Sequence, residues 1–371
     1  MYKGTGISKD QLSDDGEPCI LYGELYTKYK SETIREVISK TNIDNTKLVR
    51  SKANDVIIPC SGETAEDIAT ARCVLNGNIL LGGDLNIIRL HGYDGAFMSY
   101  QLNGRRKYDI AKVAQGVSVV HLYGEHLKGV KTINPCLEEQ KKIANLLSII
   151  DERIATQNKI IDKLQSLIKG ILVELQKQGV NKETWKKVFL SDVLTERNER
   201  NTNLYQVFSV SVSQGVVNQL DYLGRSFAAK DTSKYNVVHY GDLVYTKSPT
   251  GSFPYGIVKQ CLNLENVAVS PLYGVYEPKS LAIGAYLHEY FMSEINTHNY
   301  LHPLIQKGAK NTINITNQRF LENSVLLPIN TNELLLISKM LRSLNDKLKY
   351  QQDTLQKYQK QKKYLLRQMF I

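Results

Sequence analysis

The chain has 371 residues, of which 42% are hydrophobic and 23% are charged. This composition suits two or three folded domains and excludes a disordered tail. The formal net charge of +10 fits a polyanionic partner such as nucleic acid, although an ordinary basic protein has the same property. The five cysteines form no CxxC pair, and neither a signal peptide nor a stretch of ~18 apolar residues occurs. A disulfide framework, a zinc knuckle and a membrane span are therefore not expected, and a cytoplasmic location is.

Short β-type runs mark the parts of the chain that lie outside two long helical patterns. Residues 55–61 combine a turn, a short apolar strand and a small polar residue, and residues 242–248 repeat this pattern. Further strands are expected at residues 84–89, 188–193, 207–212, 237–245 and 325–327. The sequence therefore predicts two globular parts of mixed α/β type.

A long amphipathic helix is predicted in the middle of the chain. Apolar residues recur at alternating steps of four and three from Ile143 to Leu175, interrupted by the polar Gln157. This heptad spacing keeps an apolar stripe turned toward a partner helix. Pro135 precedes the pattern and Gly179 follows it, as the ends of helices prefer.

A second helix of the same design closes the chain. A shift of 194 residues superposes the two patterns, so that Gln157 falls on Gln351. Pro328 precedes this helix as Pro135 precedes the first, and two unrelated helices would share these features only by chance. The two seams consist of Ile143, Leu147, Ile150, Ile154, Gln157, Ile161, Leu164, Ile168, Ile171 and Leu175, and of Ile337, Leu341, Leu344, Leu348, Gln351, Leu355, Tyr358, Lys362, Leu365 and Met369.

Each amphipathic helix needs a partner, and the other helix of the same chain is the nearest one. At 1.5 Å per residue each seam is ~50 Å long. If the helices pack antiparallel, a pseudo-two-fold axis relates the two repeats, and Gln157 meets Gln351 where a polar pair fixes the register. Such a rod would hold two DNA readers about one to one and a half turns of duplex apart. The expected fold class is α+β, with two globular mixed α/β domains joined by two long antiparallel coiled-coil helices.

The residues that open the first helix resemble a known protein family. The run from Pro135 to Ile154 strongly resembles the central conserved region of type I restriction-modification specificity (S) subunits, and the match continues to about Gln176. The stretch from Pro328 is a weaker copy that resembles the distal conserved region. Residues 4–9, 18–25 and 83–86 resemble parts of a target-recognition domain. The resemblance therefore covers essentially the whole chain.

This resemblance implies four parts: a target-recognition domain over residues 1–134, a central spacer helix over 135–180, a second target-recognition domain over 181–327 and a distal spacer helix over 328–371. It implies that each domain reads one half of a bipartite site in double-stranded DNA, while the helices set the spacer and dock two methyltransferase (M) subunits. S-adenosylmethionine would be bound by M, which methylates adenine N6, and ATP and magnesium by the restriction (R) subunits that cut DNA. This chain is then expected to bind no cofactor and to carry no catalytic site.

The N-terminus departs from the family pattern. Family members have further residues ahead of the Gly-x-Gly-Ile-Ser stretch, and the second repeat has them between Trp185 and Asn198. Met1 stands almost at this stretch, so the first target-recognition domain is expected to lack an edge strand.

Candidate DNA-binding residues follow from the chemistry of the contacts. Phosphate contacts use Lys, Arg and small polar donors, and base contacts also use Asn and Gln. In the second domain the candidates lie in two expected loops, 246–252 and 306–311, and in the first domain a basic run follows an Asn-Gly loop signal. The basic residues at 357–367 of the last helix are expected instead to form a solvated or M-facing surface. The candidates are Lys9, Arg50, Lys52, Ser61, Arg105, Arg106, Lys107, Lys247, Ser248, Thr250, Ser252, Lys307, Lys310 and Asn311.

Two other functions compete with this one: a coiled-coil scaffold that binds proteins but has no DNA specificity, and an unrecognised nuclease. The run 139–141 has the E-x-K spacing of some nucleases, but it lies on the amphipathic helix without a partner acid on a strand. Neither a GxxxxGK[ST] phosphate loop nor an Asn/Asp-Pro-Pro-aromatic motif occurs. The pairs His298 and His302, and His121 and His126, have spacings that could hold a metal, but no further ligands stand near them in the sequence, so no metal is expected.

Overall fold

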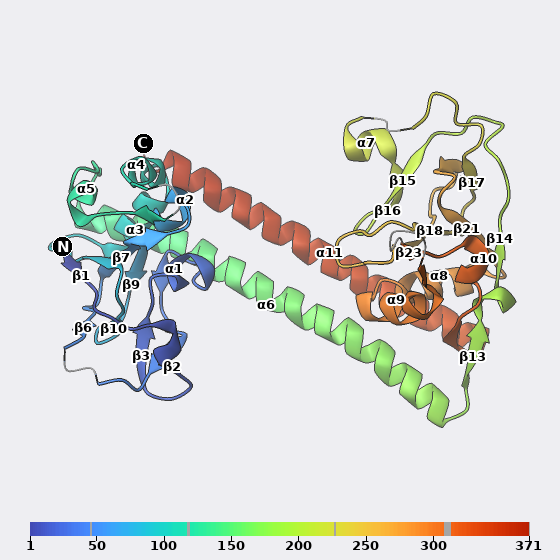
Figure 1. The fold of residues 1–371 in the computed structure, drawn as a ribbon, viewed down its shortest axis with the longest axis horizontal. Coiled ribbons are helices and arrows are strands. Elements are labelled where there is room, and N and C mark those ends of the chain that lie inside the picture. The colour runs from blue at the N-terminus through green and yellow to red at the C-terminus, as the bar shows by residue number, and fades with distance from the viewer. Residues whose placement is uncertain (45–46, 117–118, 226–227, 308–312, 371) are drawn as a thin grey trace. The chain divides into compact units, whose positions relative to one another are not determined.

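The computed structural model describes residues 1–44, 47–116, 119–225, 228–307 and 313–370. The chain separates into two compact units: unit 1 comprises Met1–Ile160 and Gln351–Ile371, and unit 2 comprises Ile161–Tyr350. Each unit contains one globular part and one half of each long helix. These helices are α6 (Leu137–Asn181) and α11 (Thr331–Gln368), green and red in Figure 1.

The globular part of unit 1 is built on a five-stranded sheet in the order β1-β11-β7-β9-β4, with a second sheet in the order β2-β5-β3-β10-β6. Side chains of the central strand alternate between two cores: Val56 and Ile58 pack with helices α3 and α4, while Ile57 packs with the second sheet. The elements are β1 (Tyr2–Lys3), β2 (Leu12–Ser13), β3 (Glu17–Ile20), α1 (Glu24–Thr27), β4 (Thr33–Ile34), β5 (Ser39–Thr41), β6 (Val49–Arg50), β7 (Asp55–Pro59), β8 (Ser61–Gly62), α2 (Ala65–Ile68), β9 (Arg72–Val74), β10 (Leu80–Leu81), β11 (Leu85–Ile88), α3 (Gly95–Asn103), α4 (Arg106–Lys112), β12 (Val120–His121) and α5 (Gly124–Lys128).

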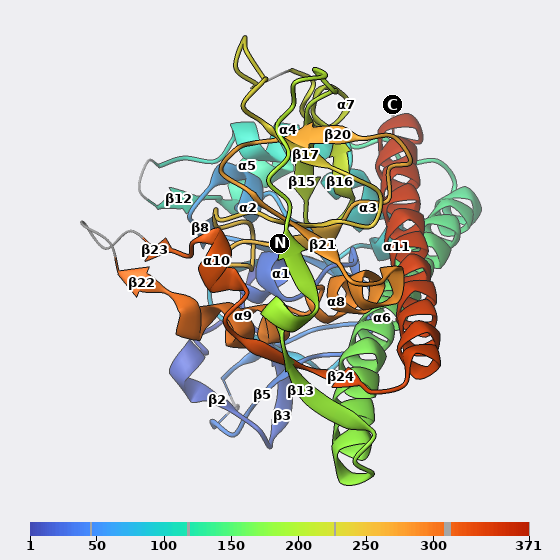
Figure 2. The same cartoon turned by 90° about the vertical axis from the view of Figure 1, so that its right-hand side faces the viewer.

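Unit 2 has a four-stranded antiparallel sheet in the order β14-β21-β18-β19. Its central strand alternates in the same way, because Leu243 and Tyr245 join the core under helix α8 and Val244 joins a second core. Strand β13 lies beside β24, where the chain leaves α6 and enters α11 (Figure 2). The elements are β13 (Trp185–Phe189), β14 (Leu194–Glu196), β15 (Phe208–Ser211), β16 (Gly215–Asn218), α7 (Gln219–Leu223), β17 (Asn236–Val238), β18 (Leu243–Tyr245), β19 (Val258–Gln260), β20 (Val267–Val269), β21 (Gly274–Pro278), α8 (Leu281–Tyr290), α9 (Glu294–Leu301), β22 (Gln306–Lys307), β23 (Ile313–Asn314), α10 (Asn317–Phe320) and β24 (Ser324–Pro328).

The two units repeat one design. The strand order β1-β11-β7-β9 in unit 1 matches β14-β21-β18-β19 in unit 2, and the helices α3, α4 and α5 are followed by α6 as α8, α9 and α10 are followed by α11. Even the helix caps agree: Asp94 accepts a hydrogen bond from the amide of Phe97 at the start of α3, and Ser280 accepts one from Ile283 at the start of α8. The expected fold class and repeat are confirmed.

The long helices pack antiparallel within each unit. In unit 1, Leu147 near the start of α6 shares a core with Leu365 and Leu366 near the end of α11 and with Phe370, which follows it. In unit 2, Leu172 near the end of α6 shares a core with Leu334 and Ile337 at the start of α11. All twenty members of the two expected seams are buried or half-buried. Heptad spacing therefore located the buried stripe of both helices correctly.

The two glutamines of the seams meet inside unit 1. The side-chain amide of Gln157 donates to the backbone carbonyl of Gln351 at 3.0 Å and to its side-chain oxygen. Gln157 is buried, so its amide finds its partners in the seam itself rather than in water.

Three expectations about local structure are wrong. The strand expected at 237–245 is two strands, β17 and β18, because Asp242 accepts a hydrogen bond from the amide of His239 and closes a turn between them. The strand expected at 188–193 ends at Phe189, and a 3-10 helix follows. Lys362 does not belong to a solvated face, because it is half-buried and its ammonium contacts Glu32 and Asp151. None of the described helices is both long and apolar enough to cross a membrane.

Candidate nucleic-acid interface

An arginine–aspartate clamp holds the start of the central strand in both units. In unit 1 the Arg89 guanidinium donates twice to Asp55, at 3.0 and 2.9 Å. In unit 2 Arg197 donates twice to Asp242, at 2.7 and 3.1 Å. Both aspartates are almost fully buried, so these bidentate bonds are of the strong, charge-assisted kind. The clamps fix where β7 and β18 begin, and thereby help to place the predicted loops that follow these strands.

In unit 2 the loop after β18 folds back on itself. The side chain of Thr246 accepts a hydrogen bond from Ile257 at 3.1 Å, which closes the base of the loop. Gly256 has a φ of 97°, and a side chain there would stand 1.8 Å from the Thr246 carbonyl oxygen, so only glycine fits. Thr250 and Phe253 exchange two backbone hydrogen bonds of 3.0 Å at the tip. The loop is therefore a fixed platform rather than a loose connection.

Four candidate residues lie on this platform. Ser248 and Ser252 are exposed, and Thr250 is half-buried with its hydroxyl on the Ser248 carbonyl at 3.1 Å. Lys247 is half-buried, and burial lowers the pKa of its ammonium, against which the nearby Glu196 acts. An ammonium that has already lost part of its water gains more from an added anion than a fully solvated one does.

An acidic and aromatic surface borders the platform, and sequence reasoning missed it. The hydroxyl of Ser252 donates to Glu294 at the first turn of α9. The Tyr255 ring lies 5.2 Å from the ring of His298 and 5.9 Å from that of His302, and the two histidines stack at 5.2 Å. The i,i+4 spacing of the histidines was visible in the sequence, but their aromatic neighbour was not.

The second predicted loop of unit 2 is partly outside the described residues. Lys307 belongs to β22, which pairs antiparallel with β23 to form a hairpin. Lys310 and Asn311 lie outside the described residues. The structure therefore places one candidate of this loop at the base of a hairpin.

In unit 1 two candidates are already engaged by acids. Arg50 forms an ion pair with Glu17 at 2.5 Å and also donates to the Asn78 carbonyl at 3.2 Å. Ser61 is buried on β8, and its hydroxyl donates to Asp84 at 3.0 Å. Both side chains would have to leave these acidic partners before they could bind DNA.

The basic run of unit 1 lies at a helix start rather than in the expected loop. Only Gly104 and Arg105 separate α3 from α4, and Arg106 is the first residue of α4. Arg106 lies 3.4 Å from Asp109, Lys107 is half-buried, and Arg105 is exposed. The other two candidates, Lys9 and Lys52, are exposed as well, and neither forms an ion pair with the described part of the chain.

The run 139–141 and the pair His121 and His126 were also considered for enzyme chemistry. Glu139 and Lys141 are exposed on the first turns of α6. His121 and His126 lie on either side of the Tyr123 ring, at 6.2 and 5.6 Å. Among the described residues no group of three or more His, Cys, Asp or Glu side chains could hold a metal ion.

The fold is that of a restriction-modification specificity subunit. The type I restriction-modification S subunit from M. genitalium aligns with 100% of this chain over 93% of its own length, with a TM-score of 0.64 and 14% sequence identity. The HsdS subunit from Thermoanaerobacter tengcongensis aligns over 92% of this chain and 88% of its own, with a TM-score of 0.38 and 13% identity. The likeness that defines the fold is the one to the M. genitalium subunit.

The sequence is similar to that of a curated specificity subunit. Over 160 residues the chain is 28% identical to the type I restriction enzyme MjaVIII specificity subunit of Methanocaldococcus jannaschii, a segment that spans 43% of this chain and 36% of the relative. The match thus covers about a third of that relative's length. No protein-family model matches the chain. The expected resemblance to type I specificity subunits is confirmed by these relatives.

Proposed function

We propose that this chain is the DNA-specificity subunit of a type I restriction-modification complex. The observation that carries the proposal is the repeat: two globular parts of one design, each followed by a long helix, with the helices antiparallel. A reader of a single continuous site needs no such duplication, whereas two readers on a pseudo-two-fold frame suit a site of two halves. The likeness in fold to an S subunit supports the same conclusion.

Each globular part would read one half of the site. In unit 2 the reader is the platform after β18, where exposed serines and the partly desolvated Lys247 stand together. In unit 1 the readers are the exposed Lys9, Lys52 and Arg105, since Arg50 and Ser61 are held by acids. Phosphate contacts would position each part, and side chains that enter a groove would specify bases.

The helices would set the spacing and bind the methyltransferase subunits. Both helices expose large apolar side chains away from the seam, which is costly unless a partner covers them. In a type I complex the natural partners are two M subunits. The exposed apolar residues of α6 and α11 include Leu146, Ile149, Ile160, Leu167, Leu336, Met340 and Tyr364.

The catalytic chemistry would belong to other subunits. This chain would bind neither S-adenosylmethionine nor ATP and magnesium, which would act on the M and R subunits. Restriction and methylation would then depend on this chain only for the choice of DNA sequence. The complex would work in the cytoplasm.

A salt titration separates this function from its competitors. The chain in complex with the M subunit of its locus is titrated with duplex DNA at rising salt, with and without magnesium. The proposal expects affinity to fall steeply with salt, because Lys and Arg displace counterions from phosphates. The absence of salt-dependent DNA binding would indicate a protein scaffold, and magnesium-dependent cutting by the purified chain alone would indicate a nuclease.

The platform of unit 2 is tested by substitution. Lys247→Ala and Ser248→Ala are compared with Lys40→Ala, an exposed lysine on β5 that serves as a matched loss of charge. Removal of a platform side chain that binds a base should weaken DNA binding by about 1–3 kcal/mol and relax the sequence at one position of the half-site. Unchanged affinity and unchanged methylated sequence in both platform variants would remove this loop from the reading surface.

A further inference from the structure

We propose that Lys247 and Glu196 of unit 2 together read one G·C base pair of the second half-site, Lys247 as the donor to guanine and Glu196 as the acceptor from cytosine. The inference rests on the proposed function, to which it adds an acidic reader and the identity of one base pair. Its evidence is the way in which the sheet, α10 and the platform place these two opposite charges.

Lys247 and Glu196 lie on the same face of the unit 2 sheet. Side chains alternate along a strand, so Lys247 continues the row of Leu243 and Tyr245 beyond the end of β18. Leu243 lies opposite Tyr276 of β21, and Tyr276 lies opposite Glu196 at the end of β14. Residues that lie opposite each other on paired strands point to the same face. The fold thus turns an acid and a base from two different strands toward one surface.

Lys247 has hydrogen-bonding capacity that the protein does not use. Its ammonium is half-buried, and burial lowers its pKa while the nearby Glu196 raises it. Within the described part of the chain this ammonium makes neither a hydrogen bond nor an ion pair, with Glu196 or with any other group. Its three N–H donors have therefore lost part of their water without gaining a partner, and they are available to a ligand.

Glu196 is held in place through one of its two carboxylate oxygens. The Asn317 side chain of α10 donates to this oxygen at 2.6 Å. Asn317 is itself fastened, because the Tyr276 hydroxyl donates to its backbone carbonyl at 3.0 Å and the Tyr276 ring stacks on Phe320 at 4.7 Å. A carboxylate has about four acceptor sites, so Glu196 can accept from a ligand without leaving Asn317.

An available donor beside a fixed acceptor matches the groove edge of a G·C pair. In the major groove guanine presents two neighbouring acceptors, N7 and O6, and cytosine presents its N4 amino donor. Lysine donates to both guanine acceptors, and glutamate accepts from the cytosine amino group. An A·T pair presents its donor between two acceptors instead, so the thymine O4 atom would face the Glu196 carboxylate with no hydrogen between them. The two residues are therefore expected to select G·C and to reject A·T.

Unit 1 has a different side chain at the equivalent place. The repeat of residues 55–61 in 242–248 brings Cys60 onto Lys247. Burial raises the pKa of the Cys60 thiol to about 11, so this side chain is neutral at neutral pH. A neutral thiol is only a weak donor. The inferred G·C pair therefore belongs to the half-site of unit 2 alone.

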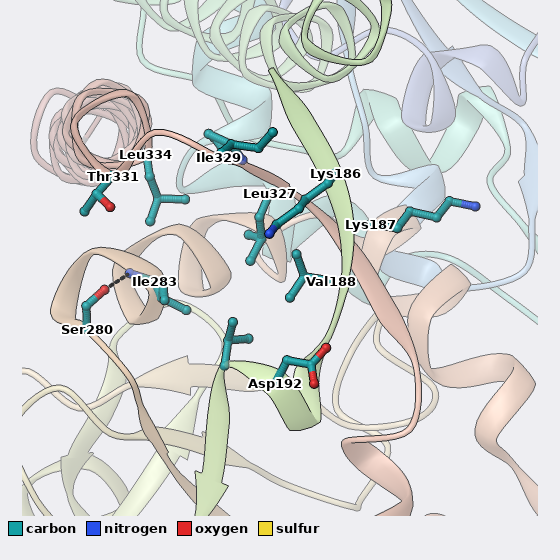
Figure 3. Close-up of a pocket in the computed structure, with 12 residues that line it drawn as sticks. Lys186, Lys187, Val188, Asp192, Ser280, Ile283, Leu327, Ile329, Thr331 and Leu334 are labelled. Atoms are coloured by element: carbon teal, nitrogen blue, oxygen red, sulfur yellow. Dashed lines mark hydrogen bonds between the residues drawn. The ribbon is translucent and has the colours of Figure 1, made fainter. Parts of the chain in front are cut away.

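Unit 2 also offers a lysine and an acid that serve as matched controls. Lys186 and Asp192 are exposed, and they line a cavity of about 430 Å³ between β13, α8 and the start of α11 (Figure 3). Apolar side chains such as Ile283 and Leu327 form the wall of this cavity, and no platform residue lines it. Substitution of Lys186 or Asp192 removes the same charge from the same unit without touching the proposed reading pair.

The test begins with maps of N6-methyladenine in cells that express the M subunit of the locus with this chain or its variants. We expect Lys247→Ala to relax one base pair of the motif and this pair to be G·C in the wild type. Glu196→Ala should relax the same pair. Lys186→Ala and Asp192→Ala should leave the whole motif unchanged.

Base analogues at this pair then assign each contact in binding titrations of the complex with M. 7-Deazaguanine lacks the N7 acceptor, and N4-methylcytosine has a methyl group in place of the amino hydrogen that faces the groove. Each analogue should weaken binding by the wild-type complex about tenfold. Glu196→Ala should remove the effect of N4-methylcytosine and keep that of 7-deazaguanine, and Lys247→Ala should do the reverse.

The outcomes distinguish this inference from the proposed function. A bipartite motif without a Lys247-sensitive pair, an A·T pair at that position, or a Glu196→Ala variant that changes the affinity for all duplexes equally would overturn the inference alone. The absence of any motif despite a stable complex with M would overturn both. Titrations of the wild-type complex with analogues at each G·C pair of the half-site need no variant, and insensitivity to both analogues at every pair would also overturn the inference.

Discussion

The two units fasten their globular parts to the helices with opposite chemistry. In unit 1 the carboxylate belongs to the helix: Asp151 of α6 accepts from the hydroxyl of Tyr100 on α3 at 2.8 Å and from Ser31 at 2.8 Å. Lys362 of α11 completes the joint, since its ammonium lies 2.5 Å from Asp151 and also contacts Glu32. Burial raises the pKa of the Glu32 carboxyl, an effect that the Lys362 charge opposes.

In unit 2 the carboxylate belongs to the globular part. Glu289 of α8 accepts a hydrogen bond from Asn345 of α11. Asn345 is the residue that the 194-residue repeat brings onto Asp151. Arg342, one turn earlier, lies 3.9 Å from the same carboxylate. In unit 1 the helix carries the accepting carboxylate, whereas in unit 2 the helix carries the donor and the globular part carries the carboxylate.

This difference shows how two domains of one design can each prefer their own helix surface. If the globular part of unit 2 were placed on the unit 1 helices, its Glu289 carboxylate would face Asp151. Two carboxylates at one buried site repel each other. A unit 1 domain placed on the unit 2 helices would bury Glu32 without a lysine, because the repeat brings Ile168 onto Lys362. Unpaired buried charges cost several kcal/mol. The joints therefore favour one pairing of domain and helix over the other.

The largest expected effect is the loss of the unit 1 lysine. Lys362→Met would leave Glu32 and Asp151 buried together without their cation, which should cost about 3–5 kcal/mol of unfolding free energy in unit 1. Hydrogen exchange of α3 peptides in the full chain measures this loss. Lys357→Met, an exposed lysine of the same helix, is the control and should change stability by less than about 0.5 kcal/mol. Equal hydrogen-exchange protection of α3 in both variants would contradict this role of Lys362.

The next effect is a pH dependence in unit 2. Burial raises the pKa of Glu289 to about 7, so its contribution to stability is present below its unfolded value of 4.5 and is lost as pH rises through about 7. Burial lowers the pKa of His288 to about 3, so its contribution is present above its unfolded value of 6.5 and is lost as pH falls toward 3. Between pH 5 and 6.5 the two groups oppose each other. The neighbouring Lys259, with a pKa lowered to about 8 by burial, stays charged there.

The variant Glu289→Gln separates the two groups. The variant removes the Glu289 carboxyl, which stabilises unit 2 at low pH, and leaves His288. The unfolding free energy should therefore fall by up to about 2 kcal/mol from pH 6.5 to pH 5. Denaturation of the full chain is followed by the fluorescence of Trp185, the single tryptophan, which lies in unit 2. A wild type and a variant with the same pH profile would contradict this balance.

A smaller effect is expected at the glutamine pair of the seam. Gln157→Leu leaves the side-chain oxygen and the backbone carbonyl of Gln351 without this donor and should cost about 1–2 kcal/mol. The double variant Gln157→Leu with Gln351→Leu should regain this loss, since apolar residues at such positions stabilise coiled coils while weakening register. Urea unfolding of the full chain measures both. A double variant no more stable than the single one would show that the pair does not act as a unit.

The smallest effect is expected at Arg50 of unit 1. Its ion pair with Glu17 competes with DNA, so Arg50→Ala should alter the salt dependence of DNA binding less than Lys247→Ala does in unit 2. Removal of the platform lysine should reduce the salt slope by about 1. An equal drop for Arg50→Ala would show that the arginine exchanges Glu17 for a phosphate on binding.

Periodic features were predictable from the sequence, because they repeat a local rule. The seams of both helices, their polar position and the strands at 84–89 and 325–327 follow from spacing alone. The joints were not predictable, since Glu32, Tyr100 and Lys362 are far apart in sequence and only the tertiary fold joins them. Lys362 was interpreted as a solvated residue because of its basic neighbours, although its place in the heptad seam indicated burial.

The candidate site was predictable in outline only. The repeat of 55–61 in 242–248 located two equivalent strands, and the clamps on Asp55 and Asp242 explain why. Some candidate side chains are held by partners within the protein that composition cannot reveal, as Asp84 holds Ser61, and are therefore less accessible to DNA. The bordering ring of Tyr255 also came only from the structure, because the loop must fold back before it meets α9.

The most direct test of the central claim is a map of N6-methyladenine in cells that express this chain with the M subunit of its locus. The proposed function predicts methylation at a bipartite motif, two short specific halves separated by a fixed gap, and Lys247→Ala should relax one half alone. Methylation without a motif, or an unchanged genome despite a stable complex with M, would contradict it.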